Sequence, residues 1–192
     1  MKIYFATHNA NKLRELRALI PDNLELLGLD DLGLHEEIPE TADTIEGNSA
    51  MKTRYVFQKH RVACFGDDTG LEVEALGGAP GVYSARYAGP GNDSQANMDL
   101  LLSNLENQEN RKARFKTVIT YIDDQGHEYQ FTGVAKGEII REKTGAQGFG
   151  YDPIFLPEGE NRTFAEMSAA EKNARSHRAR AFEQLIQFLK TK

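Results

Sequence analysis

Apolar residues recur along the chain with two different periods, and the two alternate. Short apolar or alternating runs predict strands, whereas apolar residues three and four apart predict helices. The predicted strands cover residues 3–6, 24–29, 62–65, 71–75, 114–122 and 128–135, with 139–140 continuing the sheet. The predicted helices cover 13–20, 44–59 and 94–105, followed by a long C-terminal helix. Strands that alternate with helices in this way indicate a mixed α/β protein.

Polar residues at the helix starts predict the caps. Asp43, with Glu46 three residues on, is a variant capping box for the helix over 44–59. Ser94 is expected to cap the next helix. The Ser168-x-x-Glu171 pattern is a further capping box, and it predicts the start of one long C-terminal helix with a buried apolar face.

Composition excludes several classes of protein. The 192 residues fit one large domain or two small lobes, with 40% hydrophobic and 27% charged residues. A net charge of −6 argues against broad nucleic-acid binding. Cys64 is the only cysteine, which excludes a disulfide framework and a Cys-rich zinc site. Neither a signal-peptide core nor a membrane-length apolar run is present, so we expect a cytoplasmic protein that binds no membrane.

The charge is unevenly distributed. Residues 30–46 hold seven acids and no Lys or Arg, whereas residues 172–192 hold six cations and only Glu183 as an acid. An acidic side and a basic side suit a substrate that combines a metal ion with phosphate. Two solvated surfaces are the commoner explanation of such a pattern.

Two adjacent carboxylates, Asp67 and Asp68, follow the apolar run that ends at Phe65. The strand is predicted to stop at Gly66. Carboxylates held on a rigid strand suit Mg²⁺, which prefers one or two carboxylates, several waters and phosphate oxygens. The alternative is an ordinary Asx turn.

A polar turn, Thr7-His8-Asn9-Ala10-Asn11-Lys12, enters the first helix. Backbone N–H groups at a helix start favour an anion, and Lys12 adds a full charge. The turn is not a P-loop, because its glycine pattern is missing. Simple capping by Asn9 or Asn11 is the alternative.

Three further features have both a structural and a functional interpretation. Glu40 precedes the second predicted helix, where it can reach a metal ion, and Lys52 lies about two turns inside that helix. A lone helical lysine is usually solvated. The segment from Gly145 to Pro153 is glycine-rich and carries two aromatic residues; it either closes over a flat ring, with Phe149 stacking on a base, or tucks its aromatics into the core.

Five motifs occur in the order found in one family. They are Thr7-x-Asn9-x-x-Lys12, Asp67-Asp68-Thr69-Gly70-Leu71, Leu76-Gly77-Gly78-Ala79-Pro80-Gly81, Phe149-Gly150-Tyr151-Asp152-Pro153, and Glu171-Lys172-Asn173 followed by Ser176-His177-Arg178. Over nearly its whole length the chain resembles the non-canonical purine NTP pyrophosphatases, the inosine/xanthosine triphosphate pyrophosphatase family.

The resemblance implies Mg²⁺-dependent hydrolysis of ITP, dITP and XTP to the monophosphate and pyrophosphate. It implies a mixed α/β fold in which a long mixed central sheet is flanked by helices. Residues 1–192 would form a single domain of two lobes, with the active site in the cleft between them. It also implies a homodimer.

The same resemblance implies the site residues. Asp68 would be catalytic and, with Glu40, would hold the metal. The implied substrate-binding residues are Thr7, His8, Asn9, Ala10, Asn11, Lys12, Lys52, Thr69, Phe149, Gly150, Tyr151, Asp152, Lys172, His177 and Arg178, with Arg86 as a weaker candidate.

One position departs from the family pattern. Relatives usually have Glu where this chain has Gly47, so the role of that Glu is open here, and Glu46 is not assumed to replace it. Thr69 stands for the commoner Ser and keeps the hydroxyl.

Two other functions remain as rivals. One is a related nucleotide pyrophosphatase that acts on other bases, and the other is a nucleotide-binding sensor without catalysis. The intact pair of Asp67 and Asp68, together with Lys12, argues against the sensor, because water attack on a phosphoryl group needs alignment and neutralising charge.

Overall fold

The computed structural model describes all 192 residues, which form two compact units. Unit 1 comprises Met1–Asp68, Thr117–Gly133 and Arg178–Lys192, and unit 2 comprises Thr69–Lys116 and Val134–His177. The strand order in the sheet is β2-β1-β3-β5-β6-β7, with β4 paired to β3. None of the helices combines the length and the apolar character needed to cross a bilayer.

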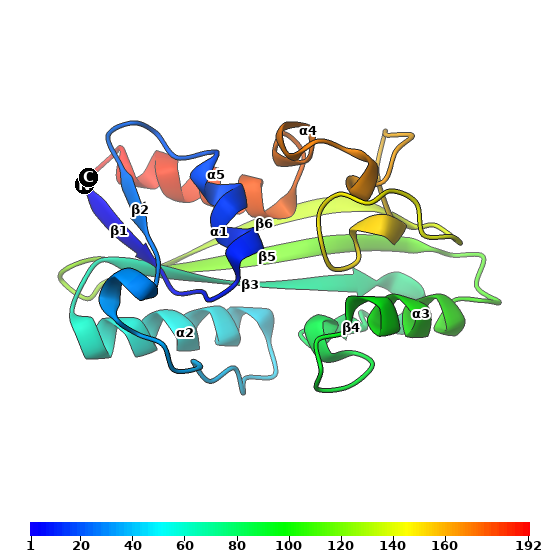
Figure 1. Cartoon of the computed structure of the whole chain (residues 1–192), viewed down its shortest axis with the longest axis horizontal. Helices are drawn as coiled ribbons and strands as arrows, with labels where there is room; N and C mark the ends of the chain where they lie inside the picture. Colours follow the sequence, from blue (N-terminus) through cyan, green and yellow to red (C-terminus); the bar gives the residue numbers. More distant parts are fainter. The chain divides into compact units, whose positions relative to one another are not determined.

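In unit 1, parallel strands pack between helices (Figure 1). Strand β1 (Lys2–Phe5) pairs in parallel with β2 (Glu25–Leu27) and with β3 (Cys64–Val73). The helices of this unit are α1 (Ala10–Arg17), α2 (Ile45–His60) and α5 (His177–Leu189).

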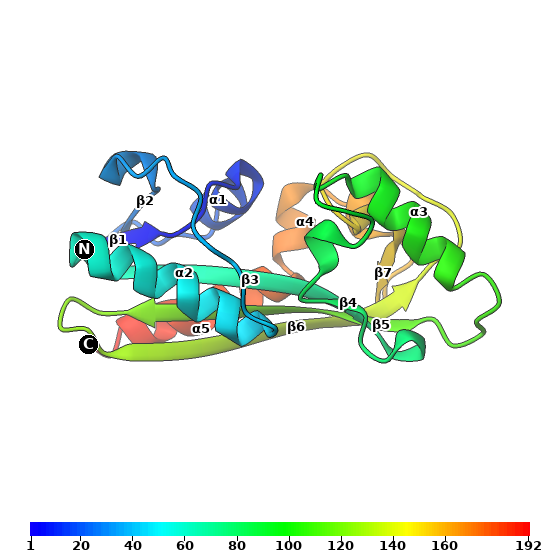
Figure 2. The ribbon, with the colours of Figure 1, turned by 90° about the horizontal axis from the view of Figure 1, so that it is seen from below.

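Alternation along β3 separates the two apolar layers of unit 1. Phe65 faces one layer, where it packs with Phe182 of α5, and Cys64 faces the other, where it packs with Val56 of α2. Because successive side chains of a strand point to opposite faces, α5 and α2 cover opposite faces of the sheet. The views of Figures 1 and 2 agree with this arrangement.

Unit 2 has its own core. Strands β5 (Lys112–Ile122) and β6 (Glu128–Ile139) contribute residues to both units, and β4 (Pro80–Gly81) and β7 (Phe155–Pro157) are antiparallel to β3 and β6. Helices α3 (Ser94–Asn104) and α4 (Ala169–Asn173) complete the unit. Short 3-10 helices occupy Asp30–Leu32, Glu74–Leu76, Ser84–Arg86, Asp152–Ile154 and Phe164–Glu166.

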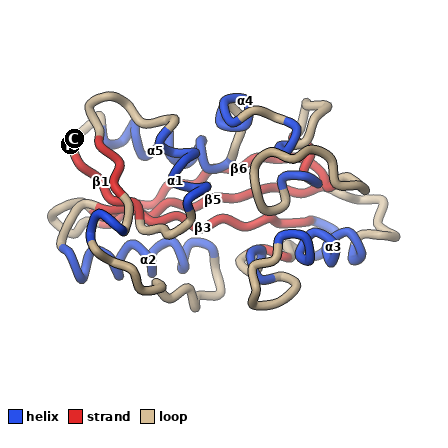
Figure 3. The backbone as a smooth tube through the Cα atoms, viewed as in Figure 1, coloured by secondary structure: helices blue, strands red, loops and turns tan.

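Two strand predictions were wrong in extent. The strand that was predicted to stop at Gly66 continues through both aspartates to Val73, and Figure 3 shows β3 as one unbroken strand. Strand β6 runs to Ile139, beyond its predicted end at Ala135, which confirms that Ile139 continues the sheet.

Two predictions of helix caps were also wrong. Thr44, not Asp43, caps α2, and its Oγ1 accepts from the N–H of Gly47 at 2.9 Å. Asp93, not Ser94, caps α3. Neighbouring residues that can both cap a helix cannot be ranked from the sequence.

The C-terminal region forms two helices where one was predicted. The capping box of Ser168 and Glu171 is confirmed, but it opens only the short α4. Helix α4 ends at Asn173 with Ala174 as its C-cap, and α5 begins at His177. The N–H of Arg175 donates to the carbonyl of Lys172 three residues back, which is the tightened last turn common at helix ends.

Candidate functional site

The two aspartates lie inside β3, not after it. Asp67 has no exposed surface, and the side chain of Asp68 is 14% exposed. Charged groups are rarely buried unless partners offset the loss of hydration. The contacts of each carboxylate therefore define the site.

Asp67 is held by two cations of unit 1. The Lys12 ammonium donates to Oδ1 at 2.9 Å, and Arg178 Nε donates to Oδ2 at 3.0 Å. Burial alone would raise the pKa of this carboxyl, but the attraction of Lys12 and Arg178 outweighs burial and holds the pKa well below its usual value. Asp67 is therefore an ionised structural partner of these two cations.

Asp68 is arranged differently. Its Oδ1 lies 4.0 Å from the Lys52 ammonium, and its Oδ2 is buried and accepts no hydrogen bond. Burial raises the pKa of Asp68 to about 6, against the attraction of Lys52 and Lys12. A buried carboxylate oxygen without a donor is costly, and a cation or a water held there would offset that cost.

Lys52 belongs to the same cluster. Its ammonium contacts the carboxylate of Glu40, and its side chain is almost fully buried. Burial alone would lower the pKa of Lys52, but Asp67, Asp68 and Glu40 outweigh burial and raise it. The solvated lysine expected from the helix pattern alone was therefore wrong, and Lys52 faces the two acids that the resemblance assigns to the metal.

The polar turn that enters α1 is occupied by its own capping contacts. Asn9 Oδ1 accepts from the N–H groups of Asn11 and Lys12, at 3.0 and 3.2 Å, and Thr7 Oγ1 accepts from the N–H of Asn9. His8 Nε2 lies 3.0 Å from a backbone carbonyl, that of Glu36. The capping alternative is confirmed, so the charge offered to an anion here comes mainly from the Lys12 side chain.

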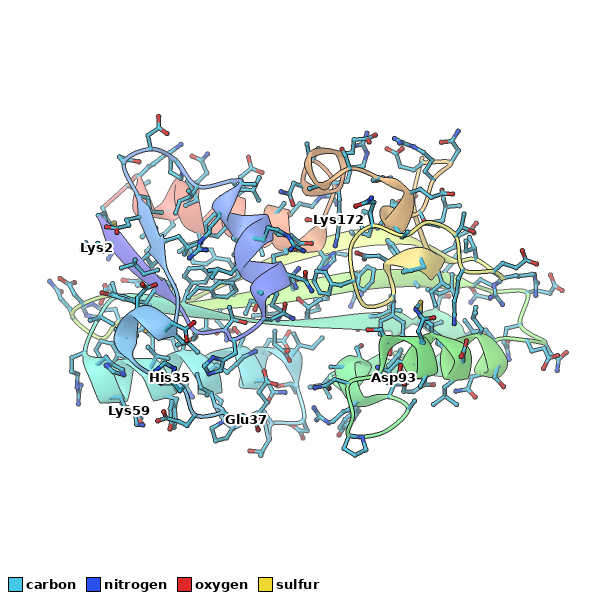
Figure 4. The ribbon with its side chains drawn as sticks, viewed as in Figure 1. Lys2, His35, Glu37, Lys59, Asp93 and Lys172 are labelled. Atoms are coloured by element: carbon cyan, nitrogen blue, oxygen red, sulfur yellow. The ribbon has the colours of Figure 1, made fainter.

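A second cluster of predicted site residues lies in unit 2. The Lys172 ammonium, from α4 (Figure 4), donates to Asp152 Oδ2 at 2.7 Å and lies 4.6 Å from the centre of the Phe149 ring. The N–H of Phe149 donates to the same oxygen of Asp152 at 3.1 Å. A fixed cation, a fixed carboxylate and an aromatic ring are thus brought together.

Glycine is required in the turn that makes this cluster. Gly148 has a φ of +71°, and a Cβ atom there would lie 2.1 Å from Asp152 Oδ2. Gly150 has a φ of +61°. Both conformations strain L residues, so these glycines allow Phe149 and Asp152 to approach each other.

Tyr151 and His177, two predicted site residues, have aromatic rings that are packed in the interior. The Tyr151 hydroxyl donates to the carbonyl of Ser84 at 2.6 Å, and the ring belongs to the core of unit 2. His177 stacks on Phe115 with ring centres 4.6 Å apart. Both rings therefore anchor the segments that carry the neighbouring site residues. Thr69 is half-buried and follows Asp68 on β3.

At Gly47, the position that departs from the family pattern, the close packing of neighbouring atoms explains the glycine. A Cβ atom there would lie 2.7 Å from Ala42 Cβ and 2.8 Å from Thr44 Oγ1. The first turn of α2 therefore packs too closely for any side chain. The acid that contacts Lys52 is Glu40, which comes from the preceding loop.

The sequence did not single out Glu15. Its Oε2 accepts from Arg178 Nη1 at 2.6 Å. The sequence feature that could have identified Glu15 is its position three residues after Lys12, which puts both side chains on one face of α1.

The mixed α/β fold is that of the Ham1 protein of Staphylococcus aureus, with a TM-score of 0.90 at 36% identity, covering 100% of this chain and 99% of that one. The chain belongs to the Ham1 family, whose model matches residues 3–188.

Several relatives of the chain are described by an activity. The dITP/XTP pyrophosphatase of Flavobacterium johnsoniae is 54% identical over 98% of each chain. That of Porphyromonas gingivalis is 50% identical, over 98% of this chain and 97% of the relative. A solved structure from Mycobacterium abscessus, a nucleoside-triphosphatase and dITP/XTP pyrophosphatase, has a TM-score of 0.78 at 43% identity, over 96% and 98% of the two chains. The family resemblance predicted from the five motifs is confirmed.

Proposed function

We propose that this protein hydrolyses the non-canonical purine nucleoside triphosphates dITP, XTP and ITP to the monophosphate and pyrophosphate, which removes them from the nucleotide pool. The names of relatives that match almost the whole chain support this function. The observation that carries it in this chain is Asp68, a half-buried acid beside two lysines, with one buried carboxylate oxygen that accepts no hydrogen bond.

Glu40 and Asp68 are the residues that would hold Mg²⁺. The donor set fits this ion, because Mg²⁺ is usually bound by one or two carboxylates together with waters and phosphate oxygens. The unpaired Asp68 Oδ2 is an oxygen that a hard cation would satisfy. No group of three or more acidic, His or Cys side chains offers a metal cage, so the substrate would complete the coordination. When bound, Mg²⁺ would neutralise phosphate charge.

The residues of unit 1 would then act on the triphosphate. The ammonium groups of Lys12 and Lys52 would offset the charge of the phosphate chain. Asp68 would orient the attacking water and take its proton, which is the usual task of a positioned carboxylate. Release of pyrophosphate requires that the water attacks the α-phosphorus.

The residues of unit 2 would hold the base. Phe149 would stack on the purine ring, and the Lys172 ammonium beside it would donate to the 6-oxo group of hypoxanthine or xanthine. Adenine presents an amino donor at that position, which would face Lys172 with no acceptor. One unpaired buried polar group costs about 1–3 kcal/mol.

Guanine keeps the 6-oxo group, so its rejection needs another contact. A donor near position 2 of the ring would tolerate the hydrogen of hypoxanthine or the oxygen of xanthine and would oppose the amino group of guanine. Sites built on such hydrogen bonds reach discrimination of ~10⁴.

Other parts of the expected function stay predictions. They are the single two-lobed domain over residues 1–192 with its active site between the lobes, the homodimer, the cytoplasmic location, and the contacts of Thr7–Lys12, Thr69, Arg86 and Phe149–Asp152 with substrate.

A panel of nucleoside triphosphates tests the proposal. Each nucleotide is incubated with the protein and Mg²⁺, and pyrophosphate is resolved from orthophosphate. We expect pyrophosphate from dITP, XTP and ITP and little product from ATP or GTP. Pyrophosphate mainly from other bases would favour the related pyrophosphatase, and nucleotide binding without product would favour the sensor.

A further inference from the structure

Four charged side chains of unit 1 form a chain of alternating sign that begins and ends on α1. The Lys12 ammonium donates to Asp67 Oδ1 at 2.9 Å, and Arg178 Nε donates to Asp67 Oδ2 at 3.0 Å. Arg178 Nη1 then donates to Glu15 Oε2 at 2.6 Å. Lys12 and Glu15 are three residues apart on α1, so the helix itself closes the ring. We call these four residues the charge ring.

The charge ring is buried. The side chains of Asp67 and Arg178 are 0% and 2% exposed, and that of Glu15 is 11% exposed. Each charge has a neighbour of opposite sign at hydrogen-bond distance, which is the condition under which buried charges are tolerated. Moving one member therefore weakens the contacts of its neighbours in the ring, so the geometry of the ring is constrained.

Arg178 has a task in the ring that lysine cannot perform. A guanidinium is planar and donates in fixed directions from separate nitrogens, whereas an ammonium is a single point charge. Arg178 uses Nε for Asp67 and Nη1 for Glu15, and so it joins β3 to α1 from the first turn of α5.

We propose that Glu15, Arg178 and Asp67 are positioning residues, which hold α1 and the Lys12 ammonium in the orientation that binds phosphate. This proposal rests on the proposed function. An ammonium has three donors, and Lys12 gives one of them to Asp67. That contact fixes the direction of the remaining donors. Glu15 acts through Arg178 and Asp67 without touching the substrate.

Two substitutions at Glu15 separate position from charge. Glu15→Asp keeps the charge but shortens the side chain by one methylene, and Glu15→Gln keeps the length but removes the charge. The probe is inorganic pyrophosphate with Mg²⁺, titrated into the protein by calorimetry, because it has no base and needs no turnover. We expect both variants to bind pyrophosphate about tenfold more weakly than the parent, within the range measured for coupled residues.

The matched control is Glu25, whose carboxylate lies 3.7 Å from Lys2 on an exposed face of the same unit. Glu25→Asp and Glu25→Gln should bind pyrophosphate like the parent. If Glu15 acted only through its negative charge, Glu15→Gln would bind pyrophosphate more tightly and Glu15→Asp would bind it normally. That result would overturn the proposal.

A double-mutant cycle shows whether Glu15 acts through Lys12. In a Lys12→Ala background, Glu15→Asp and Glu15→Gln should change pyrophosphate affinity less than twofold, because the group that they position is gone. An equal loss in both backgrounds would reveal a general structural effect and would overturn the proposal. If Glu15→Asp does not fold, Glu15→Gln carries the same cycle.

The experiments distinguish failure of the Glu15 proposal from failure of the proposed function. If the parent protein binds pyrophosphate but does not produce it by hydrolysis of dITP, the proposed function is refuted. The Glu15 double-mutant cycle can still be measured in that case. A parent that hydrolyses dITP while the Glu15 variants bind pyrophosphate normally would refute only the charge ring.

Discussion

Substitution of Gly66 by alanine tests how α2 is set against β3. Gly66 lies on β3 directly before the two aspartates, and its carbonyl accepts a hydrogen bond from Ser49 of α2 at 3.0 Å. A Cβ atom on Gly66 would lie 2.7 Å from Thr53 Oγ1, 3.2 Å from the Ser49 carbonyl oxygen and 3.3 Å from Lys52 Cβ. The helix and the strand therefore approach too closely for one additional methyl group.

The neighbours of that methyl group cannot move aside easily. Thr53 Oγ1 donates to the Ser49 carbonyl and lies 3.0 Å from the carbonyl of Thr120, and all three residues are buried. Overpacking a core in this way costs about 1–3 kcal/mol. With a urea m-value of about 2 kcal/mol/M, the unfolding midpoint of Gly66→Ala should fall by roughly 0.5–1.5 M.

Urea unfolding followed by circular dichroism measures the effect. The control is Gly91→Ala, because that position has no atom within 4 Å and no left-handed φ. Thr53→Ala in the Gly66→Ala background removes the closest contact, so the double variant should lose less stability than the sum of the single variants, by about 1 kcal/mol. A Gly66→Ala midpoint equal to that of Gly91→Ala would refute the close approach of α2 and β3.

Three further predictions concern single side chains. Asp68→Asn should lower pyrophosphate release by about 10²–10⁴ while the melting temperature is kept, because the only base offered to water is lost; activity within a few-fold of the parent would show that the chemistry lies elsewhere. Lys12→Ala should lower kcat/KM for every nucleoside triphosphate by a similar factor, since all share the phosphates; a strong change in the ratio of dITP to GTP turnover would place Lys12 at the base. Burial raises the pKa of the Cys64 thiol to about 12, so its thiolate fraction at pH 8 should be about 10⁻⁴. Ellman's reagent should therefore label the native protein at least 100-fold more slowly than the urea-unfolded chain, and equal rates would contradict the burial.

The apolar pattern predicted most elements but misjudged the centre of β3. Asp67 and Asp68 interrupt an apolar run, so the sequence indicates a strand end at Gly66. The strand continues because Asp67 is paired with Lys12 and Arg178, which lie 55 and 111 residues away in the chain. A local sequence pattern cannot indicate ion pairs between residues so far apart in the chain.

The break between α4 and α5 was hidden for a similar reason. Neither glycine nor proline lies between Asn173 and His177, so periodicity favours one continuous helix. At the break the N–H of Arg175 donates to the carbonyl of Lys172 three residues back, a tightened turn that no residue type marks in the sequence.

The candidate site depended on the order of five motifs more than on local chemistry. Local reasoning treated Lys52 as solvated, whereas its burial beside Glu40 depends on the fold. Glu15 belongs to no motif and emerged only from its contact with Arg178.

Hydrolysis of dITP in oxygen-18-labelled water tests the central claim most directly. The protein is incubated with dITP and Mg²⁺, and the products are analysed by mass spectrometry. We expect one labelled oxygen in dIMP and none in pyrophosphate, because Asp68 directs water to the α-phosphorus. Label in pyrophosphate or in orthophosphate would contradict it, since water would then have attacked a different phosphorus.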